Sequence, residues 1–219
     1  MKVIVVTPHP DDETLGCGGT ILRHKKEGDQ VCWLIVTKMG DGFEPSRREK
    51  REKEIERVKE MYNFDEVFQL HFDAGTLERI PLGNIINEMS RCFNNFQPNI
   101  VYLPYPGDIH SDHKVVFDAA VACTKWFRYP FVDRVLVYET LSETDFTINP
   151  DANQFRPNVF VNISPYLEKK IEIMRIYESE LGEHPFPRSV RAIKSLAYLR
   201  GAAAGCAAAE AFMLLKERL

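Results

Sequence analysis

Four residues near the start of the chain, His9, Asp11, Asp12 and Glu13, place one imidazole and three carboxylates within five positions. His9 and Asp12 are spaced i, i+3, so a tight turn can direct both side chains to one point while Asp11 projects in another direction. An imidazole together with a carboxylate suits a zinc-type ion, and a catalytic zinc typically has three protein ligands and one open position. This stretch alone is equally typical of an acidic turn that contains a histidine, so a third ligand must lie elsewhere.

A second group of the same residue types lies near the middle of the chain, in the sequence His110-Ser111-Asp112-His113. Its two histidines are again spaced i, i+3, and either of them can complete a set of metal ligands. Taken separately, Asp112 could cap a following helix and the nearby Asp108 could be a turn residue. Because both groups directly follow predicted strands, their joint occurrence favours a metal site over two ordinary turns.

The glycines that follow the first group, Gly16, Gly18 and Gly19, raise the alternative of a phosphate-binding loop. Their spacing matches neither the dinucleotide-binding pattern G-x-G-x-x-G nor the P-loop, which needs a lysine followed by serine or threonine. Glycines at the start of a helix also allow that helix to approach a sheet closely. We therefore expect these glycines to serve packing.

Apolar runs alternate with helical patterns over the first two thirds of the chain. Strands are predicted over 2–7, 30–37, 66–72, 99–103 and 134–139. Helices are predicted over 16–27, 45–62, 82–96 and 112–127. The strands are apolar on both faces, which is typical of a parallel sheet covered by helices. The sequence therefore predicts an α/β fold with a Rossmann-like, mostly parallel sheet and helices on both faces.

The last third of the chain has a different pattern. A short strand is predicted over 158–163, and two helical stretches are predicted over 164–181 and 189–219. We expect residues 163–219 to form a helical C-terminal extension of a single domain that spans residues 1–219. The stretch 142–156 is polar and is predicted to be a loop.

This organisation predicts that the two chemical groups meet. In open parallel sheets, ligands bind outside the carboxyl ends of the strands, near the point where the strand order reverses. The loop over 8–13 follows the first predicted strand, and the loop over 104–113 follows the fourth. We expect these loops to lie side by side although they are far apart in the sequence.

The bulk composition narrows the class of partner. With a net charge of −4, the chain lacks the basic balance typical of nucleic-acid binders. Its five cysteines are far apart and form no C-x-x-C, which indicates a reducing compartment rather than a disulfide framework. No signal-peptide pattern is visible, and the alanine-rich stretch 201–215 is shorter than the about 20 apolar residues of a membrane span. We expect a cytoplasmic protein without a membrane span or nucleic-acid partner. The sequence does not decide between a monomer and a homo-oligomer.

The two motifs together resemble those of a known enzyme family. The sequence PHPDDETLGCGGT over 8–20, followed by HSDH over 110–113, closely resembles the PIG-L/LmbE-like deacetylases. Members of that family are metal-dependent enzymes that remove the acetyl group from N-acetylglucosaminyl and related amino sugars. The stretches 155–164 and 188–212 are similar to later segments of the bacterial branch, so the resemblance runs over most of the chain.

The resemblance implies a role for each residue that matches the family motifs. It implies one divalent metal ion, Zn²⁺ in the first place with Fe²⁺ as the alternative, held by His9, Asp12 and His113. It also implies that Asp11 is the general base and that His110 acts as general acid or stabilises the oxyanion.

The same resemblance implies supporting residues around these groups. Asp112 would orient His110 and favour its protonated form. Either Asp11 or His110 could deliver the proton to the leaving amine, and the sequence leaves this open.

Candidate substrate contacts lie outside the two motifs. Arg51 is the best match for a substrate-binding arginine of the family, with Arg47 and Arg48 as rivals on the same charged helix. Each of these arginines could equally belong to a solvated face. Asp108 stands where some members have a tyrosine near the second motif, and it is the expected substrate contact on that side.

The resemblance therefore implies a deacetylase that hydrolyses the N-acetyl group of an N-acetylglucosamine-like amino sugar or its conjugate. One alternative is a metal-dependent amidase or esterase that acts on a non-sugar substrate. Another is a non-catalytic module that binds a nucleotide or sugar nucleotide and holds no metal tightly.

Overall fold

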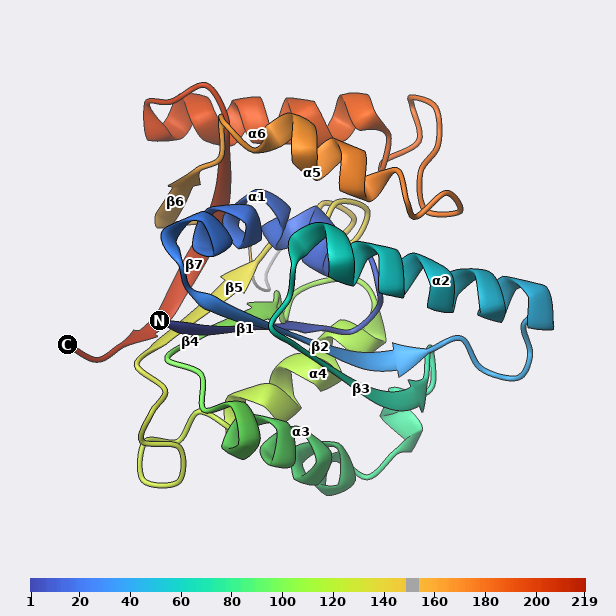
Figure 1. Cartoon of the computed structure of the whole chain (residues 1–219), viewed down its shortest axis with the longest axis vertical. Coiled ribbons are helices and arrows are strands. Elements are labelled where there is room, and N and C mark those ends of the chain that lie inside the picture. The colour runs from blue at the N-terminus through green and yellow to red at the C-terminus, as the bar shows by residue number, and fades with distance from the viewer. Residues whose placement is uncertain (149–153) are drawn as a thin grey trace.

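A computed structural model describes residues 1–148 and 154–219 and shows one seven-stranded sheet with the strand order β3-β2-β1-β4-β5-β7-β6 (Figure 1). The strands are β1 (Lys2–Thr7), β2 (Gln30–Lys38), β3 (Glu66–Asp73), β4 (Ile100–Pro104), β5 (Arg134–Tyr138), β6 (Val159–Asn162) and β7 (Ala209–Glu217). The first five strands pair in parallel, whereas β7 runs antiparallel to both β5 and β6. The sheet confirms the predicted α/β class.

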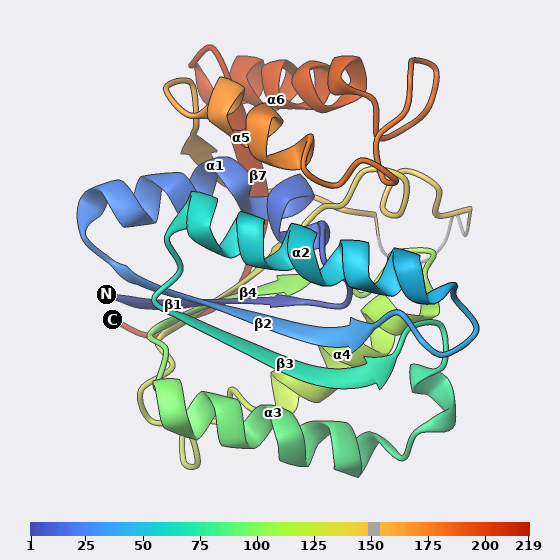
Figure 2. The same ribbon diagram turned by 45° about the vertical axis from the view of Figure 1, so that its right-hand side comes forward.

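Helices cover both faces of this sheet. They are α1 (Asp12–Glu27), α2 (Pro45–Tyr62), α3 (Leu82–Phe96), α4 (Ser111–Ala122), α5 (Leu167–Met174) and α6 (Val190–Ala204), with a short 3₁₀ helix at Leu77–Arg79. Figures 1 and 2 show α1 and α2 on one face, α3 and α4 on the other, and α5 and α6 in a further layer outside α1. None of the helices in the described part of the chain is long and apolar enough to cross a bilayer.

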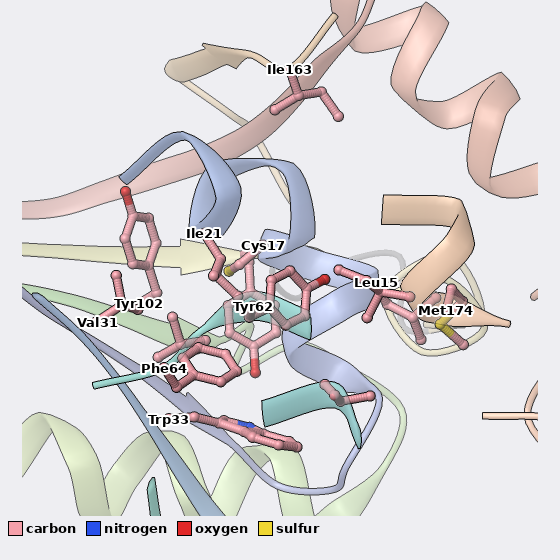
Figure 3. Packing of buried hydrophobic residues seen from close by; sticks show 14 of the residues in the cluster. Leu15, Cys17, Ile21, Val31, Trp33, Tyr62, Phe64, Tyr102, Ile163 and Met174 are labelled. Atoms are coloured by element: carbon pink, nitrogen blue, oxygen red, sulfur yellow. The ribbon is translucent and has the colours of Figure 1, made fainter. Parts of the chain in front are cut away.

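Two apolar cores, one on each face, make the sheet a rigid support. Alternate residues of β1 point to opposite faces, so Val5 joins the core under α1 and α2, and Val6 joins the core under α3 and α4. In the first core, the Trp33 ring stacks on Phe64 with centroids 5.4 Å apart, and Tyr62 packs against the same phenylalanine (Figure 3). Burial on both faces explains why the strand sequences are apolar without alternation.

The glycines of α1 allow close packing, as the sequence predicted. A Cβ atom on Gly16 would lie 2.3 Å from Cδ2 of Tyr138, and one on Gly19 would lie 2.6 Å from Cβ of Ile163. These distances are too short for any side chain, so the two glycines bring α1 close to β5 and to the segment after β6.

A buried ion pair ties the C-terminal third to α1. The Glu210 carboxylate in β7 accepts hydrogen bonds from the backbone N–H groups of Gly19 (2.8 Å) and Thr20 (2.7 Å) and from Nζ of Lys170 (2.7 Å). The same ammonium group donates to the carbonyl of Leu15 at 2.8 Å. A charged pair that is fully hydrogen-bonded can be buried in this way, which accounts for a glutamate within an alanine-rich stretch.

The predicted helix over 189–219 is wrong in its second half. Helix α6 ends at Ala204, the chain turns at Gly205 with φ 71°, and strand β7 follows. Alanine favours helix locally, but β7 gains hydrogen bonds from two neighbouring strands, and this tertiary pairing overrides the local preference. The predicted helical extension over 163–219 therefore contributes a strand to the sheet as well as two helices.

Two other helix predictions were too long. The helix predicted over 112–127 ends at Ala122, and Trp126 (65% exposed) and Phe127 (63%) lie on the surface instead of continuing an apolar stripe. Only Leu167–Met174 of the stretch 164–181 is α-helical. The predicted polar loop over 142–156 includes residues 149–153, which lie outside the described residues.

Candidate metal centre and active site

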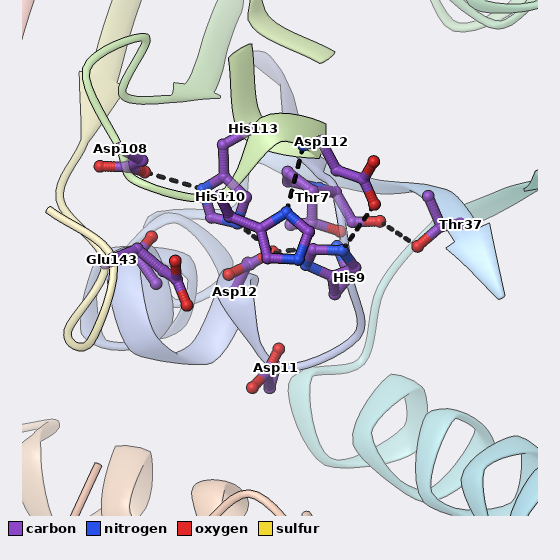
Figure 4. Close-up of polar contacts among 12 residues, drawn as sticks. Thr7, His9, Asp11, Asp12, Thr37, Asp108, His110, Asp112, His113 and Glu143 are labelled. Carbon is purple, nitrogen blue, oxygen red and sulfur yellow. Dashed lines mark hydrogen bonds and ion pairs between the residues drawn. The ribbon is translucent and has the colours of Figure 1, made fainter. Parts of the chain in front are cut away.

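The two motif loops lie side by side at the carboxyl edge of the sheet because β1 and β4 are neighbouring parallel strands. Nδ1 of His9 lies 3.5 Å from Oδ2 of Asp12, and Nε2 of His113 lies 3.5 Å from the same oxygen (Figure 4). These three residues form a group whose ligand atoms all lie within 4.8 Å of one another. The structure thus brings together the three side chains that were predicted to bind the metal.

The donor set fits a zinc-type ion in both spacing and orientation. Ligands about 2.0–2.1 Å from a tetrahedral zinc lie about 3.3 Å from each other, close to the 3.5 Å that separates Asp12 Oδ2 from each imidazole nitrogen. The second nitrogen of each imidazole faces a carboxylate, because Nε2 of His9 lies 3.1 Å from Asp112 and Nδ1 of His113 lies 2.7 Å from Asp108. Carboxylates in this position fix the ring orientation of metal-binding histidines.

The electrostatics of the centre favour a cation at this point. Burial lowers the pKa of His9, but hydrogen bonds to Asp112 and Asp12 and the charges of neighbouring carboxylates raise it to about 10. Burial raises the pKa of Asp12, but His113 and His9 lower it to about 2. The carboxylates that raise the pKa of His9, together with an Asp12 that stays ionised, would also stabilise a divalent ion.

Asp112 does not orient His110 through its carboxylate, contrary to the sequence prediction. Its Oδ2 accepts a hydrogen bond from the backbone N–H of Gly75 at 2.6 Å and faces His9. Only the backbone N–H of Asp112 reaches His110, where it donates to Nδ1 at 3.1 Å. Asp112 therefore orients a predicted metal ligand, and the contact was not predictable because Gly75 lies beyond β3.

The same hydrogen bond sets the protonation of His110. Since Nδ1 accepts from a backbone N–H, it carries no proton, and the neutral ring carries its proton on Nε2. Burial and the nearby His9 and His113 lower the pKa of His110. The predicted protonated His110 is therefore replaced by a neutral ring that lines the cavity and can donate from Nε2.

Asp11 differs from Asp12 in its backbone conformation and in the direction of its pKa shift. It precedes α1 with φ 132° and ψ −29°, so its carboxylate diverges from that of Asp12 and lines the cavity. Burial, Asp12 and Glu180 raise its pKa well above the usual range, while Arg188 opposes the rise. A carboxylate with a raised pKa is suited to exchange protons near neutral pH.

The structure does not support the predicted substrate contact of Asp108. Its side chain is fully buried behind His113 and also accepts a hydrogen bond from the hydroxyl of Thr144 at 2.5 Å. A carboxylate enclosed in this way supports the imidazole and cannot meet a ligand in the cavity.

A cavity of about 380 Å³ opens over this centre. Arg51 and Arg47 line it, whereas the third predicted candidate, Arg48, pairs with Asp41 at 2.6 Å. Arg51 reaches inward because it continues the buried stripe of α2. Its side chain is only 7% exposed, so little of its surface faces the cavity.

Sequence reasoning missed four charged residues of the cavity wall, Lys38, Glu143, Glu180 and Arg188, of which Glu143 and Arg188 bear most on the centre. Glu143 comes from the loop after β5, and burial raises the pKa of its carboxyl. Arg188 comes from the segment before α6, and its Nη1 lies 3.9 Å from Oδ2 of Asp11. Both lie in irregular segments, so no periodicity indicated where they point. The family resemblance of the stretch 188–212 was the one signal that included Arg188.

Comparison with known proteins gives a consistent result. The family model for PIG-L, described as GlcNAc-PI de-N-acetylase, matches residues 4–124, more than half of the chain. A diacetylchitobiose deacetylase of Thermococcus kodakarensis is 28% identical over 191 residues, covering 83% of this chain and 71% of that protein. A probable N-acetyl-alpha-D-glucosaminyl L-malate deacetylase 2 of Bacillus anthracis is 27% identical over 188 residues, covering 81% of this chain and 80% of that protein.

A solved structure extends the similarity beyond the matched segment. A conserved protein of Thermus thermophilus aligns with a TM-score of 0.80 and 28% identity, covering 99% of this chain and 96% of that one. The alignment therefore includes the C-terminal third, where the sequence prediction was weakest. With its two motifs joined at one centre and more than half of its length matched, the chain belongs to the PIG-L family of deacetylases.

Proposed function

We propose that this protein is a metal-dependent deacetylase that hydrolyses the N-acetyl group of an N-acetylglucosamine-like amino sugar or its conjugate. The observation that carries the proposal is the convergence of His9 Nδ1, Asp12 Oδ2 and His113 Nε2, each imidazole being backed by a carboxylate. Zn²⁺ is the ion we expect, with Fe²⁺ as the alternative. The names of the two curated relatives support the choice of an acetylated amino sugar.

The chain's own residues can carry the proton transfers of amide hydrolysis. A bound divalent ion would supply a water of lowered pKa and polarise the acetyl carbonyl. Asp11 then accepts the proton of the attacking water, and its raised pKa allows it to release that proton again. His110 donates a hydrogen bond from Nε2 to the developing oxyanion. Because a neutral imidazole is a weak acid, Asp11 is the better group to protonate the leaving amine.

The cavity wall offers the contacts that a sugar conjugate needs. Its volume of about 380 Å³ lies in the range of small-molecule sites. Glu143 can accept hydrogen bonds from sugar hydroxyls, while Arg188 and Arg47 present positive charge beside it. The mixture supports a polar sugar whose substituent carries a carboxylate or phosphate.

Two variants test this proposal. Asp11→Asn should keep the metal but lose activity by about 10²–10⁴-fold, because it removes only the proton acceptor. His113→Ala should lose both metal and activity. Elemental analysis for zinc and iron and acetate release from N-acetylhexosamine conjugates, with N-acetyl amino acids as controls, provide the measurements. Full activity of Asp11→Asn, or hydrolysis of the amino acids alone, would contradict the proposal.

A further inference from the structure

The backbone at Asp11 is strained. Its φ of 132° with ψ −29° lies outside the left-handed region that the other positive-φ non-glycine residues of the described chain occupy, with φ between 54° and 74°. A residue with a side chain persists in such a conformation only when its surroundings enforce it. Because the conformation sets the direction of the proposed base, the contacts that enforce it bear on the chemistry.

Both polar groups of the peptide bond before Asp11 are held by buried polar side chains. Nη1 of Arg51 donates to the carbonyl oxygen of Pro10 at 2.8 Å. Oε2 of Glu13 accepts from the N–H of Asp11 at 3.0 Å. The peptide after Asp11 is held as well, because its carbonyl oxygen accepts from the N–H groups of Thr14 (3.0 Å) and Leu15 (2.9 Å) at the start of α1. With both flanking peptides held, the φ angle of Asp11 is fixed.

Tyr177 connects the side chains of Glu13 and Arg51. Its hydroxyl donates to Oε1 of Glu13 at 2.8 Å, and its ring centroid lies 5.4 Å from Cζ of Arg51. Both Tyr177 and Glu13 are fully buried. Arg51 is anchored further by Oγ of Ser179 at 3.0 Å and by the carboxylate of Glu180. The segment 177–180 after α5 thus supports the peptide from the C-terminal third.

We propose that Glu13, Arg51 and Tyr177 form a clamp that holds the Pro10–Asp11 peptide and thereby aims the Asp11 carboxylate into the cavity. The proposal rests on the proposed function, since it takes Asp11 to be the base. The three members are positioning residues, and Arg51 acts through Asp11 rather than by binding substrate. Without the clamp, the strained peptide would relax and the carboxylate would turn away.

A pair of matched tyrosine variants tests the clamp. Tyr177→Phe removes the hydroxyl that bonds Glu13, and we expect kcat to fall roughly tenfold with KM and metal content unchanged. Tyr138→Phe is the control, because Tyr138 is equally buried and its hydroxyl bonds the carbonyl of Val6 outside the clamp. In an Asp11→Asn background, Tyr177→Phe should have no further effect on kcat. Effects that multiply in the double variant would overturn the proposal.

A variant of Arg51 distinguishes a positioning role from a substrate-binding role. Arg51→Lys cannot hold Pro10 and its other anchors at once, so a clamp predicts a fall in kcat with little change in KM. A substrate contact predicts a raised KM instead, which would contradict the assignment. Arg57→Lys, an exposed position on the same helix, is the matched control and should change neither parameter.

Thermal unfolding midpoints can test the backbone strain at Asp11 without an activity assay. At an ordinary position alanine is more stabilising than glycine, but at φ 132° the order should reverse. We expect Asp11→Gly to unfold about 2–4 °C above Asp11→Ala, and the difference should vanish when Tyr177→Phe is added. Equal midpoints would refute the clamp. An inactive wild type with a retained difference of about 2–4 °C would instead refute the proposed function alone.

Discussion

Replacement of Arg188 by glutamine should move the pH dependence of the proposed reaction. Nη1 of Arg188 lies 3.9 Å from Oδ2 of Asp11, and its other terminal nitrogen lies 3.2 Å from Glu180. Burial, Asp12 and Glu180 raise the pKa of Asp11, and Arg188 is the first charge that opposes them. Arg188→Gln removes this opposition and leaves Glu180 to repel the Asp11 carboxylate, so the pKa of Asp11 rises further.

The magnitude follows from the distance. Two unit charges about 4 Å apart interact by about 1 kcal/mol in bulk water and by about 4 kcal/mol at an effective dielectric constant of about 20. At about 1.4 kcal/mol per pKa unit, these limits correspond to shifts of about 1 and about 3 units. Since the Arg188 side chain is 23% exposed, solvent screening favours the smaller value. We expect the pKa of Asp11 to rise by about 1 unit.

The sign of the effect on activity is fixed by the role of Asp11. A base works in its deprotonated form, so activity is lost as the pH falls through its pKa. The acidic limb of kcat against pH should therefore move upward by about 1 unit in Arg188→Gln, while kcat at high pH stays unchanged. Acetate release measured from about pH 5 to 9 at saturating metal gives the profile. Arg191→Gln, an exposed position on α6, is the control. An acidic limb that does not move would refute the reasoning.

Three further substitutions, two of them with matched controls, test the supporting structure. Asp108→Asn should weaken metal binding by about 10–100-fold in a chelator competition, because its carboxylate backs a predicted ligand. Gly16→Ala should destabilise the fold by about 1–3 kcal/mol because its Cβ meets a buried ring, as urea unfolding can measure. Gly83→Ala, with open space around it, should stabilise by about 0.4–1 kcal/mol. Lys170→Met should lower the free energy of unfolding by about 3–5 kcal/mol, because it leaves the buried carboxylate of Glu210 without its charged partner. Lys169→Met, at a neighbouring side chain that is 41% exposed, should change the free energy of unfolding by less than about 0.5 kcal/mol.

Local sequence was sufficient where an element's own residues decide its structure. Helix α2 runs over Pro45–Tyr62 as predicted, because proline suits its first turn and Ile55, Val58 and Tyr62 form a buried stripe. Strand β7 could not be predicted in this way. Its alanine-rich approach favours helix, and only the unpaired edges of β5 and β6 make a strand the better choice.

The candidate site likewise has contacts that the sequence could predict and contacts that it could not. The motif spacing indicated which side chains converge, because the topology of a parallel sheet places both loops at one edge. It could not indicate that Asp112 faces His9 instead of His110, since that depends on how the loop after β3 meets α4. Nor could it place Arg188, which is oriented by neighbours from distant segments.

The contact between Glu210 and α1 has a consequence for the order of events during synthesis. The loop that carries His9 and Asp12 leaves the ribosome before Tyr177, Arg188 and Glu210, which come from the C-terminal third of the described fold. Until β7 pairs with β5, the nascent chain has an open sheet edge and a helix α1 with an unmatched buried surface. We therefore expect the proposed metal to bind only after β7 has been synthesised, and shorter nascent chains to contain the motif residues without a formed metal site.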